Sequence, residues 1–228
     1  MSAPALEAGE LEVAGLLPGA SNGTFLARLG PVRVVYKPVR GEAPLWDFPQ
    51  GTLAAREVAA YRLSLALGWP RIPATVLREG PLGVGAVQAL VEADPAHHYF
   101  TLREGRAEDL RAVAAFDAIA NNADRKGGHV LLGRDGEIWC IDHGLCFHAD
   151  PKLRTVIWDF AGEPLSPDLV ADVARVAAEL RSGPLGEELA ELLTEAEALA
   201  AATRAETLVA AGRFPEPGPG RVVPWPIV

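Results

Sequence analysis

The sequence predicts an α+β fold, on three observations. Short apolar segments separated by turn residues fill the N-terminal part of the chain, as expected for hairpins. Longer segments with apolar residues at helical spacing fill most of the remainder. Of the 228 residues, 49% are hydrophobic, which is enough to bury a sizeable core. The length fits one domain built from two parts, or two small domains.

The N-terminal part reads as antiparallel strands around one helix. The helix runs from Thr52 to Leu67 and Gly68 ends it. The small-residue connection 18–24 can lay backbone N–H groups against phosphates, but without further context an ordinary hairpin turn explains it as well. The strands are expected at 11–17, 25–29, 32–36, 75–78 and 84–91.

The C-terminal part reads as mainly helical, with one short hairpin. We expect a loop at 93–101, and an extended but packed proline-rich tail at 214–228. Two short strands meet at the turn 134–136. Helices are expected at 104–120, 167–181 and 185–211.

Charge and composition exclude several classes of protein. A net charge of -9 argues against non-specific binding to nucleic acid or to anionic lipid. The chain has no apolar run of membrane-spanning length, and its acidic N-terminus lacks a signal-peptide pattern, so a cytoplasmic location is expected. Cys140 and Cys146 do not have metal or redox spacing, and we interpret them as buried thiols. The oligomeric state stays open.

The residues from Phe116 to Phe147 carry the chemistry, in the order FDAIANNADRKGGHVLLGRDGEIWCIDHGLCF. A hairpin flanked by two acidic loops can bring Asp124 and Asp142 close together at the opening of one cleft. Phosphoryl transfer to a hydroxyl needs such a pair, because one carboxylate orients the acceptor and the other holds the metal that bridges the phosphates. Taken alone, the same residues could form a helix cap and a solvated polar turn.

These residues make the chain similar to a known family. Asn-x-Asp-Arg, two short strands, then Ile-Asp-x-Gly-Leu-x-Phe resembles the catalytic core of type II phosphatidylinositol 4-kinases and of HipA-like bacterial kinases. The chain is identified as a member of the actinobacterial phosphatidylinositol 3-/4-kinase-like family, over roughly Leu16 to Phe147. That family has Asn five residues after the catalytic Asp, where this chain has His129. The matching positions are Asn122, Asp124, Arg125, Asp142, Gly144, Leu145 and Phe147.

The resemblance implies a two-lobed protein-kinase-like (phosphatidylinositol 3-/4-kinase-like) fold. It implies an antiparallel-sheet N-lobe at 1–92 and a mainly helical C-lobe at 93–228, in one continuous domain. ATP, with Mg²⁺ or Mn²⁺, would bind between the lobes. The activity implied is transfer of the γ-phosphate to a hydroxyl of an unknown acceptor, either a small polyol of inositol type or a protein.

The resemblance also implies site residues. Asp124 is the proposed base, Asn122 and Arg125 shape its loop, and Asp142 with His129 would hold the metal. Lys37 would orient phosphates, although a strand-edge lysine that blocks aggregation is the alternative. Glu57 would hold Lys37, although it could be a solvated neighbour of Arg56. Residues expected at the nucleotide are Lys37, Glu57, Ser21, Asn22, Gly23, Gln88 and Leu90.

We expect Lys37, Glu57, Asp124 and Asp142 to line one cleft. Three other functions remain open at this stage. His129 in place of Asn suits a nucleotide-binding pseudokinase that acts as a regulatory module. The same fold could transfer a nucleotidyl group. Without the resemblance, Asp124, His129, Asp142 and His143 could form a metal-dependent hydrolase site.

Overall fold

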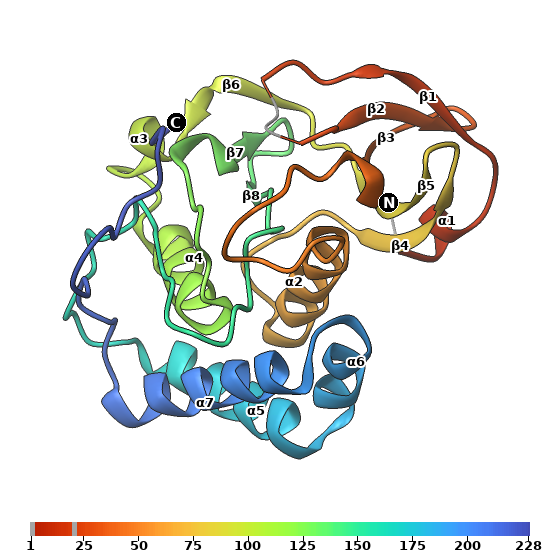
Figure 1. Cartoon of the computed structure of the whole chain (residues 1–228). Coiled ribbons are helices and arrows are strands. Elements are labelled where there is room, and N and C mark those ends of the chain that lie inside the picture. The colour runs from red at the N-terminus through yellow and green to blue at the C-terminus, as the bar shows by residue number, and fades with distance from the viewer. Residues whose placement is uncertain (1–2, 20–21) are drawn as a thin grey trace.

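The computed structural model describes residues 3–19 and 22–228, and it contains two antiparallel sheets and a set of helices (Figure 1). This arrangement confirms the predicted α+β class. The strands are β1 Leu11–Leu16, β2 Phe25–Leu29, β3 Val32–Pro38, β4 Thr75–Gly80, β5 Gly83–Ala89, β6 Ala93–His98, β7 Val130–Gly133 and β8 Ile138–Cys140. The helices are α1 Ala3–Glu7, α2 Leu53–Leu67, α3 Tyr99–Leu102, α4 Ala107–Ala120, α5 Pro167–Ser182, α6 Pro184–Leu192 and α7 Glu195–Ala211, with 3-10 turns η1 at Val39–Gly41 and η2 at Gly127–His129.

The larger sheet has the strand order β1-β2-β3-β5-β4, and all its pairs are antiparallel. Side chains alternate between the two faces of β3, so Tyr36 is fully buried on one face and Lys37 points to the other. Lys37 pairs with Ala86 of β5, and a Cβ at the adjacent Gly85 would lie 2.6 Å from the Lys37 carbonyl oxygen. Only glycine therefore allows β5 to approach β3 this closely at the lysine.

Helix α2 is buried between the larger sheet and the C-terminal helices. It ends where predicted, at Gly68, whose left-handed conformation (φ +85°) favours glycine. Even its charged residue Arg56 is 1% exposed. The Arg56 guanidinium donates to the Cys146 carbonyl at 2.8 Å and lies 2.6 Å from Glu197 of α7. These contacts fix α2 against two later parts of the chain.

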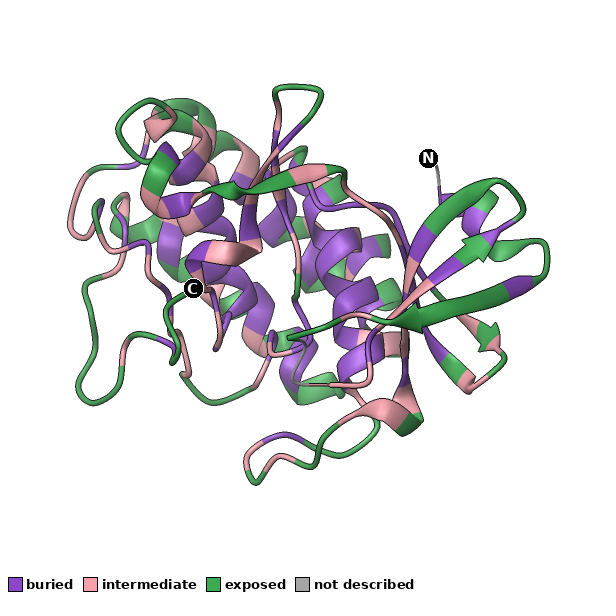
Figure 2. Cartoon of the chain, turned by 90° about the horizontal axis from the view of Figure 1, so that it is seen from above, coloured by how far each residue is buried: buried purple, intermediate pink, exposed green. Residues whose placement is uncertain are grey.

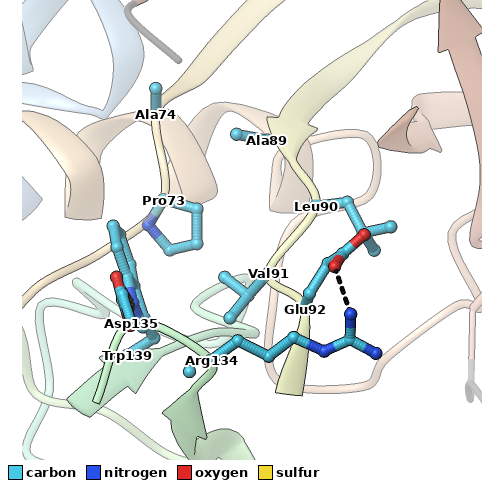
Figure 3. Close-up of a pocket in the computed structure, with 10 residues that line it drawn as sticks. Pro73, Ala74, Ala89, Leu90, Val91, Glu92, Arg134, Asp135 and Trp139 are labelled. Atoms are coloured by element: carbon cyan, nitrogen blue, oxygen red, sulfur yellow. Dashed lines mark hydrogen bonds and ion pairs between the residues drawn. The ribbon is translucent and has the colours of Figure 1, made fainter. Parts of the chain in front are cut away.

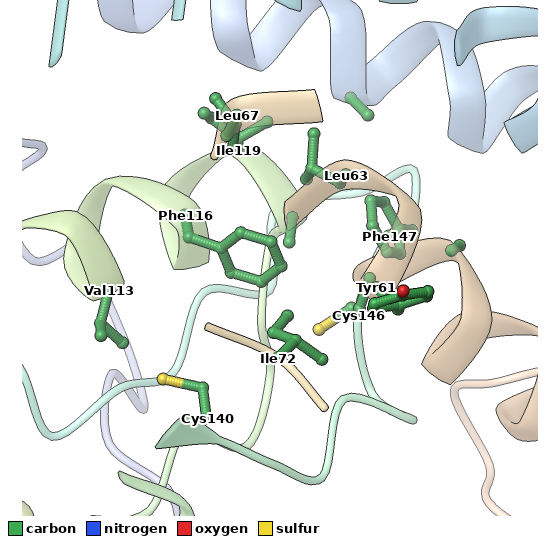
Figure 4. Close-up of a cluster of buried hydrophobic side chains, with 14 of the residues drawn as sticks. Tyr61, Leu63, Leu67, Ile72, Val113, Phe116, Ile119, Cys140, Cys146 and Phe147 are labelled. Carbon is green, nitrogen blue, oxygen red and sulfur yellow. The ribbon is translucent and has the colours of Figure 1, made fainter. Parts of the chain in front are cut away.

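The main core fills the space between α2 and α4 (Figure 4). Leu63 and Leu67 of α2 meet Phe116 and Ile119 of α4 there, and all four are nearly or fully buried. Figure 2 shows buried residues concentrated in the central helices, whereas exposed residues line much of the strands near the N-terminus. The cysteines 140 and 146 are both buried and free, as predicted.

The smaller sheet, in the order β6-β7-β8, corrects one expectation. The loop expected at 93–101 is instead strand β6 followed by the short helix α3. Strand β6 pairs with β7 only through Ala93–Gly133 and His98–Leu131, with an irregularity between them. Its residues are mostly exposed, so they lack the apolar alternation by which a strand is recognised from sequence.

The C-terminal helices correct a second expectation. The helix expected at 185–211 is two helices, α6 and α7, separated at Leu193 and Thr194. Thr194 caps α7: its side chain accepts from the Glu197 N–H at 3.3 Å, and the Glu197 carboxylate accepts from the Thr194 N–H at 3.1 Å. Thr-x-x-Glu is a capping-box sequence that the apolar spacing concealed.

The proline-rich tail is extended, and the expected packing holds for Phe214, which is 3% exposed, and for the backbone, where the Val222 carbonyl accepts from the Thr155 N–H. It does not hold for the side chains of Trp225 and Ile227, which are 78% and 40% exposed. In the described part of the chain, no helix combines the length and apolar character that crossing a bilayer requires.

Candidate active site

Lys37 links three parts of the chain that are distant in sequence. Its ammonium donates to Glu57 of α2, and it lies 3.1 Å from Asp142, which follows β8. Burial alone would lower the pKa of Lys37, but the two carboxylates outweigh it and raise that pKa, so the lysine stays charged. Burial raises the pKa of Glu57 and Lys37 opposes this. The side chains of Lys37 and Glu57 are only 18% and 3% exposed. Lys37 is therefore not an exposed lysine on an edge strand, and Glu57 is not a solvated surface residue.

Lys37, Glu57, Asp124 and Asp142 line one cleft, of about 240 Å³. A further part of the lining comes from the loop before α2, where Phe48 is buried against Leu53 and Ala123. Other lining residues are Asn22, Gly23, Glu42, Leu45, Lys126, Gly144, Leu145 and Trp225. The cleft therefore collects two lysines and several carboxylates around one space.

A buried ion pair between Arg125 and Asp117 anchors the loop that carries Asp124 to α4. Arg125 and Asp117 are both 0% exposed at their side chains, and two nitrogens of the guanidinium lie 2.9 Å from the Asp117 carboxylate. Arg125 also donates to the carbonyls of His129 and Ile141. Removing one partner of such a pair typically costs about 3–5 kcal/mol. Arg125 therefore shapes the loop and does not reach the cleft.

Asn122 sets the position of Asp124 directly. Its side chain donates to Asp117 at 3.0 Å and accepts from the Asp124 N–H at 3.0 Å. Asn122 is fully buried, so it orients Asp124 without facing the cleft. The preceding residue, Asn121, ends α4 in the left-handed conformation (φ 53°) that asparagine tolerates.

Asp124 reaches the cleft beside a second lysine. Its carboxylate lies 3.2 Å from the ammonium of Lys126, and its side chain is 24% exposed. Burial raises the pKa of Asp124, and Lys126 partly opposes this effect. A carboxylate with a raised pKa is a better proton acceptor, as a general base requires.

Asp142 is presented by an unusual backbone. Its φ of 62° lies in the left-handed region, which few residues other than glycine adopt. The charge of Lys37 is the main cause that keeps the pKa of Asp142 far below its usual range. The other carboxylate oxygen lies 3.3 Å from Nε2 of His129. Burial lowers the pKa of His129 to about 4, so its imidazole is neutral at physiological pH.

The turn before β2 lines the cleft, but its glycine amide is not free. The Gly23 N–H donates to the Gly41 carbonyl at 2.8 Å, and a Cβ at Gly23 would lie 3.1 Å from the Gly41 Cα. The Asn22 side chain accepts from the Ala43 N–H at 2.8 Å. Asn22 and Gly23 therefore fasten the turn to the next loop, and both line the cleft at which the nucleotide is expected. Ser21 lies outside the described residues.

Two residues expected at the nucleotide face elsewhere. The Gln88 side chain is 3% exposed and donates to Thr75 of β4 at 2.9 Å, inside the sheet. Leu90 lines a separate pocket with Val91, Glu92 and Trp139 (Figure 3). Neither side chain lines the cleft: Gln88 is held by Thr75, and Leu90 lies beyond the end of β5. Any contact they make there is through the backbone.

The alternative metal-hydrolase site is wrong. Nε2 of His143 lies 2.9 Å from the Arg125 guanidinium, and burial holds the pKa of this histidine well below its ordinary value. His143 is fully buried and does not line the cleft. In residues 3–19 and 22–228, no group of three or more His, Cys, Asp or Glu side chains is arranged to hold a metal ion.

Lys126 and Trp225 also line the cleft, and neither was among the predicted site residues. Lys126 is one of only three lysines in the chain and lies within the polar motif, and this rarity could have marked it as a site residue. Trp225 comes from the C-terminal tail, far along the sequence from every other residue of the cleft. Nothing in its local sequence indicates where the tail runs.

Comparisons with known proteins place this geometry in context. The chain is 42% identical over 257 aligned positions to Protein Rv2133c of Mycobacterium tuberculosis, covering 96% of this chain and 92% of that protein. It is 28% identical to Phosphatidylinositol 4-kinase gamma 4 of Oryza sativa subsp. japonica, over 57% of this chain and 27% of the rice protein. No family model matches the chain.

Solved structures define the fold. The Golgi casein kinase with Mn/ADP bound superimposes with a TM-score of 0.59 at 13% identity, covering 90% of this chain and 73% of that chain. Hydra Fam20 with sugar gives a TM-score of 0.50 at 14% identity, covering 90% and 84% of the two chains. At these identities the likeness establishes a kinase-like fold and nothing further.

Proposed function

We propose that this chain, which belongs to the family of Protein Rv2133c of Mycobacterium tuberculosis, is an ATP-dependent phosphotransferase that moves the γ-phosphate of ATP to a hydroxyl. One observation carries the proposal: Lys37 contacts both Glu57 and Asp142 at the cleft that Asp124 also lines. The similarity to a rice phosphatidylinositol 4-kinase supports the phosphatidylinositol 3-/4-kinase-like assignment. The kinase-like fold supports it as well.

The charges of the cleft fit a nucleotide with its metal. Glu57 holds the Lys37 ammonium at the end of β3, where it would pair with phosphate oxygens. Asp142 is about half exposed at its side chain, so its carboxylate is open to a cation. Oxygen ligands of this kind suit Mg²⁺, which usually takes one or two protein carboxylates and the phosphates of the substrate. When bound, the metal would neutralise the charge of the β- and γ-phosphates.

The proposed division into lobes follows from the same cleft. The larger sheet with α2, within residues 1–92, would form the N-lobe, and residues 93–228 would form the mainly helical C-lobe. Lys37 and Glu57 then belong to the first lobe, and Asp124 and Asp142 to the second. The ion pair between Lys37 and Asp142 would then join the two lobes at the nucleotide site.

Asp124 would accept the proton of the acceptor hydroxyl. Asn122 fixes its backbone, and burial prepares its carboxylate for that proton. Lys126, 3.2 Å away, would keep Asp124 charged and meet the negative charge that develops on the transferred group. A pseudokinase does not require this second carboxylate and lysine, so their presence favours the enzyme.

The decisive experiment incubates the purified protein and Mg²⁺ or Mn²⁺ with ATP labelled at either the α- or the γ-phosphate, and follows where each label goes. A phosphotransferase passes label from the γ-position and releases unlabelled ADP, so the acceptor or inorganic phosphate carries the label. Label passing from the α-position would instead indicate nucleotidyl transfer on this fold. Tight binding of metal-ATP without turnover of either label would establish the pseudokinase, and no binding at all would overturn the proposal.

His129→Asn tests the departure from the family pattern. A neutral imidazole favours softer ions such as Mn²⁺, whereas an asparagine oxygen suits Mg²⁺. If His129 binds the metal, the variant should raise the ratio of turnover with Mg²⁺ to turnover with Mn²⁺ several-fold. Because burial lowers the pKa of His129 to about 4, wild-type metal use should be insensitive to pH between about 5.5 and 8. An unchanged metal ratio would remove His129 from the metal site.

A further inference from the structure

Arg56 is a buried side chain through which α2 contacts three other parts of the molecule. Each nitrogen of its guanidinium donates a hydrogen bond: Nε to the Thr52 hydroxyl at 3.1 Å, and the terminal nitrogens to the Cys146 carbonyl at 2.8 Å and the Glu197 carboxylate at 2.6 Å. The guanidinium also lies 5.1 Å from the centre of the Phe48 ring. One side chain therefore joins the loop before α2, the segment after β8 and helix α7.

Arg56 directly precedes the glutamate that pairs with Lys37. Successive side chains of an α-helix point about 100° apart, so Glu57 faces Lys37 while Arg56 turns toward α7. A Cβ at Gly144 would lie 3.8 Å from the Glu57 carboxylate, so the segment after β8 packs directly on this part of α2. A shift of α2 along that segment would therefore move Glu57 away from Lys37.

Glu197 is a fixed partner for Arg56, because the same carboxylate caps α7. One of its oxygens accepts from Arg56, and the other accepts from the N–H and the hydroxyl of Thr194 at 3.1 and 2.9 Å. Burial alone would raise the pKa of Glu197, but its hydrogen bonds to Arg56 and Thr194 outweigh it and lower that pKa, so the carboxylate is charged. Helix α7 packs in turn against α4 and α5. The negative charge that holds α2 thus belongs to a packed group of helices.

We propose that Arg56 is a positioning residue for phosphoryl transfer, and that it acts through Glu57. Its contacts with α7 and with the segment after β8 hold α2 where Glu57 pairs with Lys37. The inference rests on the phosphotransferase function proposed above. Protein kinases need the corresponding lysine–glutamate pair in place, and an added phosphate often orders the site. Here a carboxylate of the chain itself supplies the negative charge, so the inward position of Glu57 is built into the fold.

The experiment measures kcat for transfer of γ-label and the KM for ATP in wild type, Arg56→Met, Glu57→Gln and the double variant. Each single variant should lower kcat about 10²-fold, the loss that a displacement of about 1 Å can cause. The KM for ATP should stay within about threefold, because Lys37 keeps its contact with Asp142. If Arg56 acts through Glu57, kcat of the double variant should lie within about threefold of that of Glu57→Gln. Losses that multiply would show independent damage and overturn the proposal.

Three further variants separate positioning from stability. Glu197→Gln keeps an acceptor without the charge, so it should lower kcat less than Arg56→Met does. Glu206→Gln removes a surface carboxylate of α7 that pairs with Arg181 of α5, and it should match wild type. Leu208→Ala removes a side chain of α7 that is 6% exposed, so it should lower Tm while kcat stays within about twofold of wild type. A kcat that follows Tm across these variants would overturn the proposal.

Acetylation of the lysines by acetic anhydride tests the same contact without turnover. Burial lowers the pKa of Lys37, but its two carboxylate partners outweigh it and raise that pKa, which makes the amine slow to react. In Arg56→Met, Lys37 should lose Glu57 and react several-fold faster relative to Lys152, which pairs with Asp47. An unchanged ratio by mass spectrometry would overturn the proposal. If the ratio rises but wild type transfers no γ-label, the phosphotransferase function fails and the placement of α2 by Arg56 stands.

Discussion

Replacing Asp142 with asparagine should abolish metal-dependent ATP binding while the protein stays folded. The carboxylate is half exposed in the cleft and is the group best placed to hold a cation, so its loss should exceed the roughly 10–100-fold reduction typical of losing a residue that only supports a metal ligand. Asparagine is the suitable replacement, because it tolerates the positive φ of this position. Isothermal titration with a non-hydrolysable ATP analogue, with and without Mg²⁺, measures the effect.

The matched control is Asp150→Asn, which removes a carboxylate that is 84% exposed in the segment after the motif. It should bind metal and nucleotide as wild type does. The metal-independent part of nucleotide binding should survive in Asp142→Asn, because Lys37 keeps Glu57 as its partner. An affinity for Mg²⁺-nucleotide in Asp142→Asn within twofold of wild type would show that Asp142 does not hold the metal.

The parts of the site that could be predicted from the sequence are those with a recognisable pattern among neighbouring residues. A strand that ends in lysine, a helix with an inward glutamate and a hairpin between two acidic loops each have a local pattern. Their meeting in one cleft followed from the order of these motifs. Asp117, in the last turn of α4 before the loop that carries Asp124, pairs with Arg125 and Asn122.

The features that the sequence did not predict depend on contacts between distant segments. Strand β6 exists because β7 pairs with it, and its own residues are polar and exposed. The amide of Gly23 is engaged by Gly41, a residue that no local rule connects to it. Trp225 reaches the cleft because Gly127 and Thr155 fasten the tail, and backbone contacts leave no trace in side-chain identity.

Replacing Asp124 with asparagine should leave nucleotide binding intact and remove transfer. Loss of a general base typically lowers the rate by about 10²–10⁴-fold, so kcat should decrease by a factor of that size. The affinity for metal-ATP should stay within about twofold of wild type. The reason is geometric: Asp124 pairs with Lys126, whereas Lys37 and Asp142, which would hold the phosphates and metal, pair with each other. Single-turnover transfer of γ-label, with binding measured separately, resolves the two quantities.

The pH profile gives an independent test of the same carboxylate. Burial raises the pKa of Asp124 above its ordinary value, and the base must be deprotonated to accept the hydroxyl proton. Wild-type kcat should therefore fall as the pH drops through this raised pKa and level off above it. In Asp124→Asn the residual activity should lose this acidic limb, because the group that titrates is gone. Equal losses of ATP affinity in Asp124→Asn and Asp142→Asn, or an acidic limb that persists without Asp124, would contradict the division of labour between the two carboxylates.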